Sequence, residues 1–232
     1  MRIFIHPSSI HCLNLGDVAM MQVTVRRFRE FWPNAEIHVP NETPELLDLY
    51  CPSAKPVRPI GQQSYYTTAA FLTRLGRRLS MPALSEFDVT WRHRWPRAAA
   101  KLVASRSGEA NASEVRGFVE LVHNCDLVVA SGAGQITTSF GEAGTLVLNT
   151  MEMAQQHGIP TALLGQGIGP IDDPRLRARA AQVLPRVDLI CVRETITGPP
   201  LLDSLGVSRD RVVVTGDDAI ETVYSHRRDK LV

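Results

Sequence analysis

Long apolar runs and paired cysteines are both missing from this sequence of 232 residues. No stretch approaches the roughly 20 apolar residues that a membrane-spanning helix needs. The four cysteines, Cys12, Cys51, Cys125 and Cys191, form no C-x-x-C pair, and no histidine cluster has the spacing of a metal site. We therefore expect no membrane span, no disulfide and no bound metal.

A strong excess of either charge is also lacking, because the formal net charge is only +1. No overall field therefore favours nucleic acid as a partner. The amino-terminal run Met1–Ile5 is too short for the apolar segment of a signal peptide and is typical of a first strand. From these features we expect a cytoplasmic protein.

The sequence does contain short apolar runs that alternate with longer amphipathic segments. This alternation predicts βαβ units, parallel strands and crossover helices. We expect strands at 3–5, 35–39, 126–130, 160–164, 187–192 and 211–215, and helices at 18–31, 113–124, 146–157, 174–184, 200–205 and 219–224. The predicted fold class is α/β, with a Rossmann-like parallel sheet and helices on both faces.

Regularity fades between residues 51 and 110, where Pro52, Pro56, Pro59 and Pro82 interrupt the pattern. We expect a loop-rich insert there, with one short helix near 68–79. Residues 1–224 would then form one Rossmann-like domain that includes this insert. Residues 225–232 would form a polar tail.

Chemistry-bearing residues follow the predicted strands. In open parallel sheets, ligands bind beyond the carboxyl ends of the strands, where backbone amides converge. Glycines there let a ligand approach the backbone, and an arginine can bind a carboxylate or phosphate through two parallel hydrogen bonds. The candidates are Asn14, Gly16, Asp17, Gly132, Gly134, Gln135, Gln166, Gly167, Gly169, Arg193 and Asp217.

Two of these candidates have a plain structural interpretation as well. Asp17 lies where a helix begins and is at least as well explained as a helix cap. Arg193 directly follows an apolar strand, and its side chain would form a salt bridge with Glu194 or Asp217 if no ligand needed it. The residues alone leave both alternatives open.

The ordered set of motifs is more specific than any one of them. N-L-G-D (14–17) is followed by D-L-V-V-A-S-G-A-G (126–134), G-I-P-T-A-L-L-G-Q-G-I-G-P (158–170), D-L-I-C-V-R-E (188–194) and V-V-V-T-G-D (212–217). Over residues 14–40 and 126–220 the chain resembles the polysaccharide pyruvyl transferases. That family usually has three glycines where this chain has Gly132, Ala133 and Gly134.

The resemblance implies two Rossmann-like halves that face each other, as in the GT-B glycosyltransferases, of which this chain would be the amino-terminal half. It implies transfer of a pyruvyl group from phosphoenolpyruvate to a sugar of a cell-surface polysaccharide, without a metal or other cofactor. Asp17 and Arg193 become the expected catalytic residues, and Arg193 the one that holds the carboxylate or phosphate. The other candidates would line the cleft, form a backbone platform or contact the donor: Asn14, Gly16, Gly132, Gly134, Gln135, Gln166, Gly167, Gly169 and Asp217.

The resemblance also implies a second half that this sequence does not contain. We therefore expect a truncated or half-enzyme whose partners are phosphoenolpyruvate, a glycan acceptor and either a second half or a second copy. Ile136 and Ile168 would be exposed on the uncovered wall, which would favour association or marginal stability. The alternatives are a non-catalytic sugar- or anion-binding module or remnant, and one half of a GT-B-type glycosyltransferase.

Overall fold

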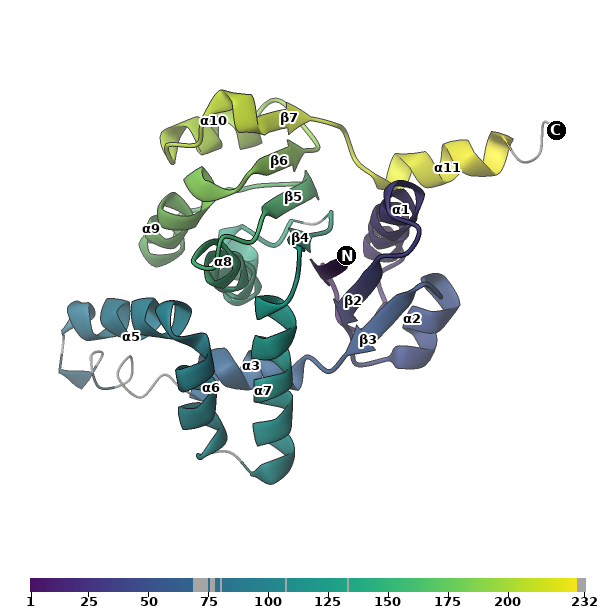
Figure 1. The fold of residues 1–232 in the computed structure, drawn as a ribbon. Coiled ribbons are helices and arrows are strands. Elements are labelled where there is room, and N and C mark those ends of the chain that lie inside the picture. Colours follow the sequence, from purple (N-terminus) through teal and green to yellow (C-terminus); the bar gives the residue numbers. More distant parts are fainter. Residues whose placement is uncertain (69–74, 76–77, 80, 107, 133, 229–232) are drawn as a thin grey trace.

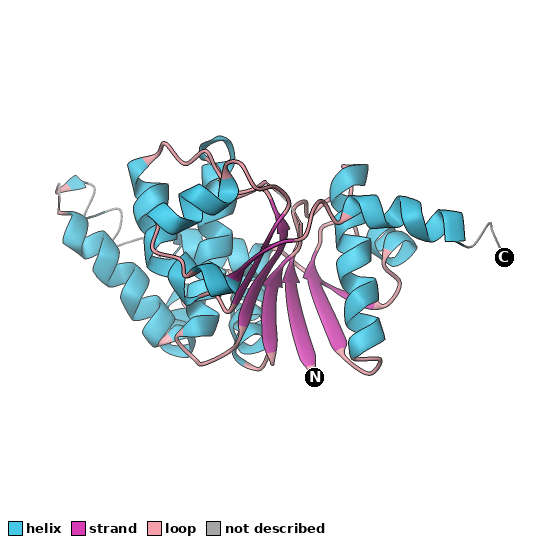
Figure 2. Cartoon of the chain, turned by 90° about the horizontal axis from the view of Figure 1, so that it is seen from above, coloured by secondary structure: helices cyan, strands magenta, loops and turns pink. Residues whose placement is uncertain are grey.

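The computed structural model describes residues 1–68, 75, 78–79, 81–106, 108–132 and 134–228. Seven parallel strands form one sheet in the order β3-β2-β1-β4-β5-β6-β7. The strands are β1 (Arg2–His6), β2 (Glu36–Pro40), β3 (Ala54–Val57), β4 (Leu127–Ala130), β5 (Thr161–Gln166), β6 (Leu189–Val192) and β7 (Val212–Val214). Figure 2 shows their arrowheads pointing to a single edge of the sheet.

Helices cover both faces of this sheet (Figure 1). The longer helices are α1 (Leu15–Phe31), α2 (Pro44–Tyr50), α3 (Ile60–Thr68), α5 (Pro82–Arg94), α6 (Pro96–Ala104), α7 (Glu109–His123), α8 (Gly141–Gln155), α9 (Pro174–Val183), α10 (Gly198–Ser204) and α11 (Ala219–Arg228). Short 3-10 turns occupy Thr138–Phe140, Leu184–Arg186 and Arg209–Arg211.

Alternate residues of each strand enter two separate cores, as the pleat of a strand requires. Ile3 and Ile5 of β1 pack with α1 and α2 on one face, whereas Phe4 packs with α6 to α10 on the other. All three side chains are fully buried. Because both faces are covered, the strands are apolar throughout rather than alternating with polar residues.

The chain reverses its direction of travel across the sheet at β1. Strand β1 pairs with β2 on one side and with β4 on the other, so successive connections leave it in opposite directions. Such a switch point opens a crevice between the loops at the carboxyl ends of the two strands. The fold therefore places the loops after β1 and β4 beside each other.

The predicted α/β class and all six expected strands are confirmed. The expectation of loops across 51–110 was wrong, because this region contains β3 and the helices α3, α5 and α6. Two of its prolines show how the region tolerates them. Pro82 stands in the first turn of α5, and Pro56 lies in the edge strand β3, where one missing backbone N–H is tolerated.

The helix expected near 68–79 falls largely on residues outside the described part of the chain. The helix expected at 219–224 is present, and it continues to Arg228 into the expected tail, while residues 229–232 also lie outside the description. The division into a domain over 1–224 and a tail stays a prediction.

The insert is fixed to the domain by a close backbone contact between α3 and α7. A Cβ added at Gly61 of α3 would overlap the backbone carbonyl of Glu114 in α7. A Cβ added at Gly117, which also lies in α7, would meet nothing within 4 Å. Only a residue without a side chain therefore allows α3 to pack this closely on α7.

Gly61→Ala should lower the free energy of unfolding by about 1–3 kcal/mol, because the added methyl group forces the two helices apart. The matched variant Gly117→Ala should raise it by about 0.5–1 kcal/mol, since alanine is the better helix former at an open site. Urea denaturation of both variants measures the difference. Equal stability of the two would contradict the assigned contact.

Candidate functional site

The loop after β1 is held in place from both ends. At its far end Asn14 caps helix α1, since its side-chain oxygen accepts a hydrogen bond from the Gly16 amide at 3.0 Å. At its near end the Gln135 side-chain amide donates to the backbone oxygens of Pro7 and Ser8 at 3.1 and 2.8 Å. Gln135 thus joins the β4 loop to the β1 loop across the switch point.

Asp17 lies half-buried in the first turn of α1, near enough to the Arg193 guanidinium to feel its charge. Burial raises the pKa of its carboxyl group above the ordinary value, while the nearby Ser8 hydroxyl and Arg193 guanidinium partly offset that rise. Helix capping is performed by Asn14 instead, so the capping interpretation of Asp17 is not needed. The structure brings Asp17 and Arg193 close enough for their charges to interact.

A pocket of about 340 Å³ opens beside Arg193 at the carboxyl edge of β4, β5 and β6. Its walls come from the three loops that follow those strands. They are lined by Gly134, Thr137, Ser139, Phe140, Gly167, Ile168, Gly169, Pro170, Arg193, Glu194 and Thr197. Among the candidates from the sequence, Gly134, Gly167, Gly169 and Arg193 therefore share one pocket.

The guanidinium of Arg193 lies directly against the backbone of Gly167. A Cβ at Gly167 would stand 2.7 Å from both Nε and Nη2 of Arg193. A Cβ at Gly134 would stand at an ordinary 3.8 Å from Nη2, so Gly134 is also near the same group. The main chain of Arg193 is fixed too, because its amide donates to the Gln166 carbonyl at 3.1 Å.

Asp217 and Glu194, the two acidic residues considered as partners of Arg193, bind different groups. Asp217 reaches it only at 3.7 Å between Nη1 and Oδ2, and the Asp217 carboxylate also accepts from the Ala219 amide at 2.9 Å. Glu194 instead accepts from the amides of Ile196, Thr197 and Gly198 at the start of α10. Those backbone bonds lower the pKa of Glu194 to about 2.

Among the described residues, Asp217 is therefore the carboxylate within ion-pair distance of Arg193, Asp17 acts on it only through its charge, and the salt bridge considered with Glu194 does not form. Its side chain is 40% exposed. A planar guanidinium with five donors, one long ion pair and an open pocket in front of it is suited to bind an incoming anion.

Two other candidates, Gln166 and Gly132, do not line the pocket but hold the strand ends and loops around it in place. Gln166 is 1% exposed, and its amide donates to the Ser131 carbonyl at 2.6 Å, which ties the end of β5 to the end of β4. A Cβ at Gly132 would stand 2.7 Å from the Met20 sulfur, so this glycine lets α1 pack onto the β4 loop. Ala133, between the two glycines, lies outside the described residues.

Ile136 and Ile168 were expected on an exposed wall, and this was wrong. They are 0% and 1% exposed, because both side chains turn inward into the core formed with α8 and α9. The exposed apolar side chains of this edge are Leu13, Leu15, Phe140, Ile196 and Ile220. All five lie in loops or helix starts that follow strands, where no periodicity distinguishes an inward from an outward side chain.

The sequence also gave no signal for several residues of the pocket. Thr137, Ser139, Phe140 and Thr197 belong to loops whose hydroxyl and aromatic residues are common everywhere. A further missed residue is Asp218, which is 6% exposed and pairs with Arg27 of α1 at 3.2 Å. Its position directly after Asp217 was the only available hint.

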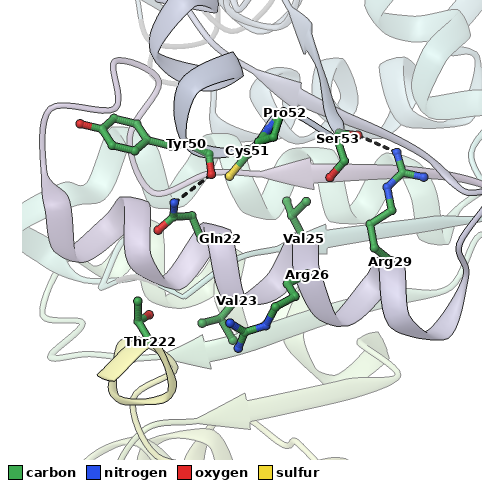
Figure 3. Close-up of a pocket in the computed structure, with 10 residues that line it drawn as sticks. All are labelled: Gln22, Val23, Val25, Arg26, Arg29, Tyr50, Cys51, Pro52, Ser53 and Thr222. Carbon is green, nitrogen blue, oxygen red and sulfur yellow. Dashed lines mark hydrogen bonds between the residues drawn. The ribbon is translucent and has the colours of Figure 1, made fainter. Parts of the chain in front are cut away.

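A second pocket of about 400 Å³ lies beside α1 (Figure 3), and none of the candidate residues is among those that line it. Its polar side chains are used in internal contacts. Arg29 donates to the Ser53 carbonyl at 2.6 Å, Gln22 donates to the Tyr50 carbonyl at 2.8 Å, and Arg26 pairs with Glu221 at 2.5 Å. These contacts explain the residues as structural, so the pocket beside Arg193 remains the candidate site.

Within the described part of the chain, no three or more His, Cys, Asp or Glu residues are grouped so that they could hold a metal ion. No described helix combines the length and apolar character needed to cross a bilayer. All four cysteines are free and buried.

Comparison with known proteins supports a family assignment. A family model described as "Polysaccharide pyruvyl transferase" matches residues 14–231, which is nearly the whole chain. No curated protein matches the chain. The matched range includes Asp17, the pocket beside Arg193 and Asp217.

The coupling between Asp17 and Arg193 predicts a measurable change in titration. Arg193→Gln should raise the pKa of Asp17 further above the ordinary aspartate value, because a cation that favours the ionised carboxylate is removed. Carbon-detected NMR of the Asp17 carboxyl group follows this titration. Arg209→Gln, at the opposite edge of the sheet, should leave it unchanged, and an unchanged value in the Arg193 variant would contradict the contact.

Proposed function

The chain belongs to the polysaccharide pyruvyl transferase family, and from this premise we propose that it transfers a pyruvyl group from phosphoenolpyruvate to a sugar of a cell-surface polysaccharide. The observation that carries the proposal is the guanidinium of Arg193, which lies against Gly167 in an open pocket with Asp217 only at 3.7 Å. Phosphoenolpyruvate carries a carboxylate and a phosphate, and either anion matches the two-pronged guanidinium.

The surrounding glycines support the same ligand. Gly134, Gly167 and Gly169 line the pocket beside Arg193, so a small anion can approach backbone amides without meeting a Cβ. No metal or other cofactor enters the proposal, and phosphoenolpyruvate is the donor substrate. An anion held by one guanidinium and by backbone groups is a common arrangement for small phosphorylated ligands.

The reaction moves three protons. One is added to the methylene carbon of phosphoenolpyruvate, and two hydroxyl groups of the sugar each lose one as they attack the neighbouring carbon to form the ketal. The bond between that carbon and the phosphate oxygen breaks, and the departing phosphate carries away one of the two hydroxyl protons. One group must donate the first proton, and another must accept a proton from an attacking hydroxyl. We assign one of these roles to Asp17, because burial raises its pKa and it lies close to Arg193.

We assign the second proton-transfer group to a second protein half that faces this edge, in a GT-B-like arrangement. The exposed apolar side chains of the edge support this part of the proposal. Leu13 and Ile196 are 76% and 81% exposed, and they belong to the loops that follow β1 and β6. Apolar side chains gathered at one edge are typical of a surface that another protein surface covers.

Binding of phosphoenolpyruvate tests the donor site directly. The protein should bind it in isothermal titration calorimetry, and Arg193→Ala should weaken binding about 10- to 100-fold, because charged hydrogen bonds contribute roughly 1.5–3 kcal/mol. Gly167→Ala should also weaken it, since the added methyl group displaces the guanidinium. Arg209→Ala is the control that should bind normally. Binding of sugar nucleotides in place of phosphoenolpyruvate would contradict the proposal and favour a glycosyltransferase half.

The exposed edge predicts association of this chain in solution. Size-exclusion chromatography with light scattering should show dimers or larger species at micromolar concentration, since Leu13, Leu15 and Ile196 are not covered within the chain. The double variant Leu13→Ser, Ile196→Ser should shift the protein toward the monomer. A stable monomer of the unchanged chain would contradict this expectation.

A further inference from the structure

An aromatic side chain stands open to solvent on the wall of the same pocket. Phe140, at the end of the 3-10 turn Thr138–Phe140, is 61% exposed and lines the pocket beside Arg193. It is the aromatic residue among the eleven that line this pocket. Leaving a phenyl ring in water loses the free energy that its burial would contribute, so an exposed ring on the wall of a pocket is a candidate for contact with a ligand.

The turn that carries Phe140 is fastened to the next loop of the sheet. The Thr138 amide donates to the Pro170 carbonyl at 2.9 Å, and the Thr138 hydroxyl accepts from the Asp172 amide at 2.7 Å. One step earlier, the Gly169 amide donates to the Ile136 carbonyl at 3.0 Å. Because these bonds join the β4 and β5 loops just before the turn and at its first residue, the backbone that carries the ring is held in place before any ligand arrives.

The lining around the ring combines hydroxyl groups with two smaller apolar residues, Ile168 and Pro170. Thr137, Ser139 and Thr197 supply the hydroxyls, and the one carboxylate among the described lining residues, Glu194, already accepts the amides at the start of α10. A hexose has the complementary chemistry, with a face of C–H groups that stacks on an aromatic ring and hydroxyls at its rim that reach polar neighbours. The pocket volume of about 340 Å³ also lies within the roughly 300–1,000 Å³ range of small-molecule sites.

We propose that Phe140 is the platform on which the acceptor sugar stacks, so that its hydroxyls face the donor held by Arg193. This inference rests on the proposed function and adds the place and the recognition chemistry of the acceptor. Phe140 touches the sugar and sets which ring face is presented. Arg193 and Asp17 remain the groups of the donor and of proton transfer.

Saturation-transfer difference NMR with a panel of methyl hexopyranosides tests the platform on the whole chain. At least one glycoside should bind with signals strongest on the C–H groups of one ring face. Phe140→Ala should weaken that binding about three- to tenfold, and Phe140→Tyr should restore it because the ring returns. Phe140→Leu keeps apolar volume but no ring, and it should behave like the alanine variant. Phe31→Ala, at the far end of α1 with a 71% exposed ring, should bind normally.

The outcomes separate this inference from the donor site. Phe140→Ala should keep full affinity for phosphoenolpyruvate, whereas Arg193→Ala should lose it. If phosphoenolpyruvate binds but no glycoside does, or if the alanine or leucine variant binds glycosides as well as the unchanged protein, the sugar platform is wrong while the donor site stands. If Phe140→Ala changes only the association state, the ring belongs to a protein contact and the platform is likewise wrong. If Arg193→Ala has no effect on phosphoenolpyruvate, the proposed function itself fails.

Discussion

The site depends on one steric constraint, the absence of a side chain at residue 167. The guanidinium of Arg193 lies so close to this backbone that a Cβ would stand 2.7 Å from two of its atoms. The absence of a side chain at Gly167 therefore allows the guanidinium to lie against the backbone of the β5 loop. The hydrogen bond from the Arg193 amide to the Gln166 carbonyl holds the main chain of Arg193 beside the same loop. Around this point the structure places an exposed pocket, a distant carboxylate and the partly buried Asp17.

The sheet topology gathers these parts from distant places in the sequence. Because β1 lies between β2 and β4, the loop that leads from β1 to Asp17 meets the loops of the other half of the sheet at the switch point. Gln135 and Gln166 then join neighbouring strand ends by hydrogen bonds to backbone carbonyls. Several polar residues predicted to contact a ligand thus hold the loops in place instead, and fewer of the predicted side chains line the pocket than the motifs suggest.

Apolar periodicity was enough to predict the parallel sheet and six of its strands, since buried strands leave a strong local pattern. The motifs after those strands correctly identified Gly134, Gly167, Gly169 and Arg193 as neighbours. The insert was misjudged because Pro82 breaks a pattern in the sequence but begins a helix in the fold. Phe140, Ile136 and Ile168 were unpredictable because the direction of a loop side chain is set by tertiary hydrogen bonds, which leave no period in the sequence.

Helix α11 ties the last strand back to the first helix across the molecule (Figure 1). Glu221 binds both Arg26 and Arg27 of α1, and Asp218 binds Arg27 at 3.2 Å. Helix α1 carries Asp17 in its first turn, and the segment leading into α11 carries Asp217. The two carboxylates near Arg193 therefore belong to segments that the same ion pairs hold together, so neither segment can change its place in the fold without breaking bonds to the other.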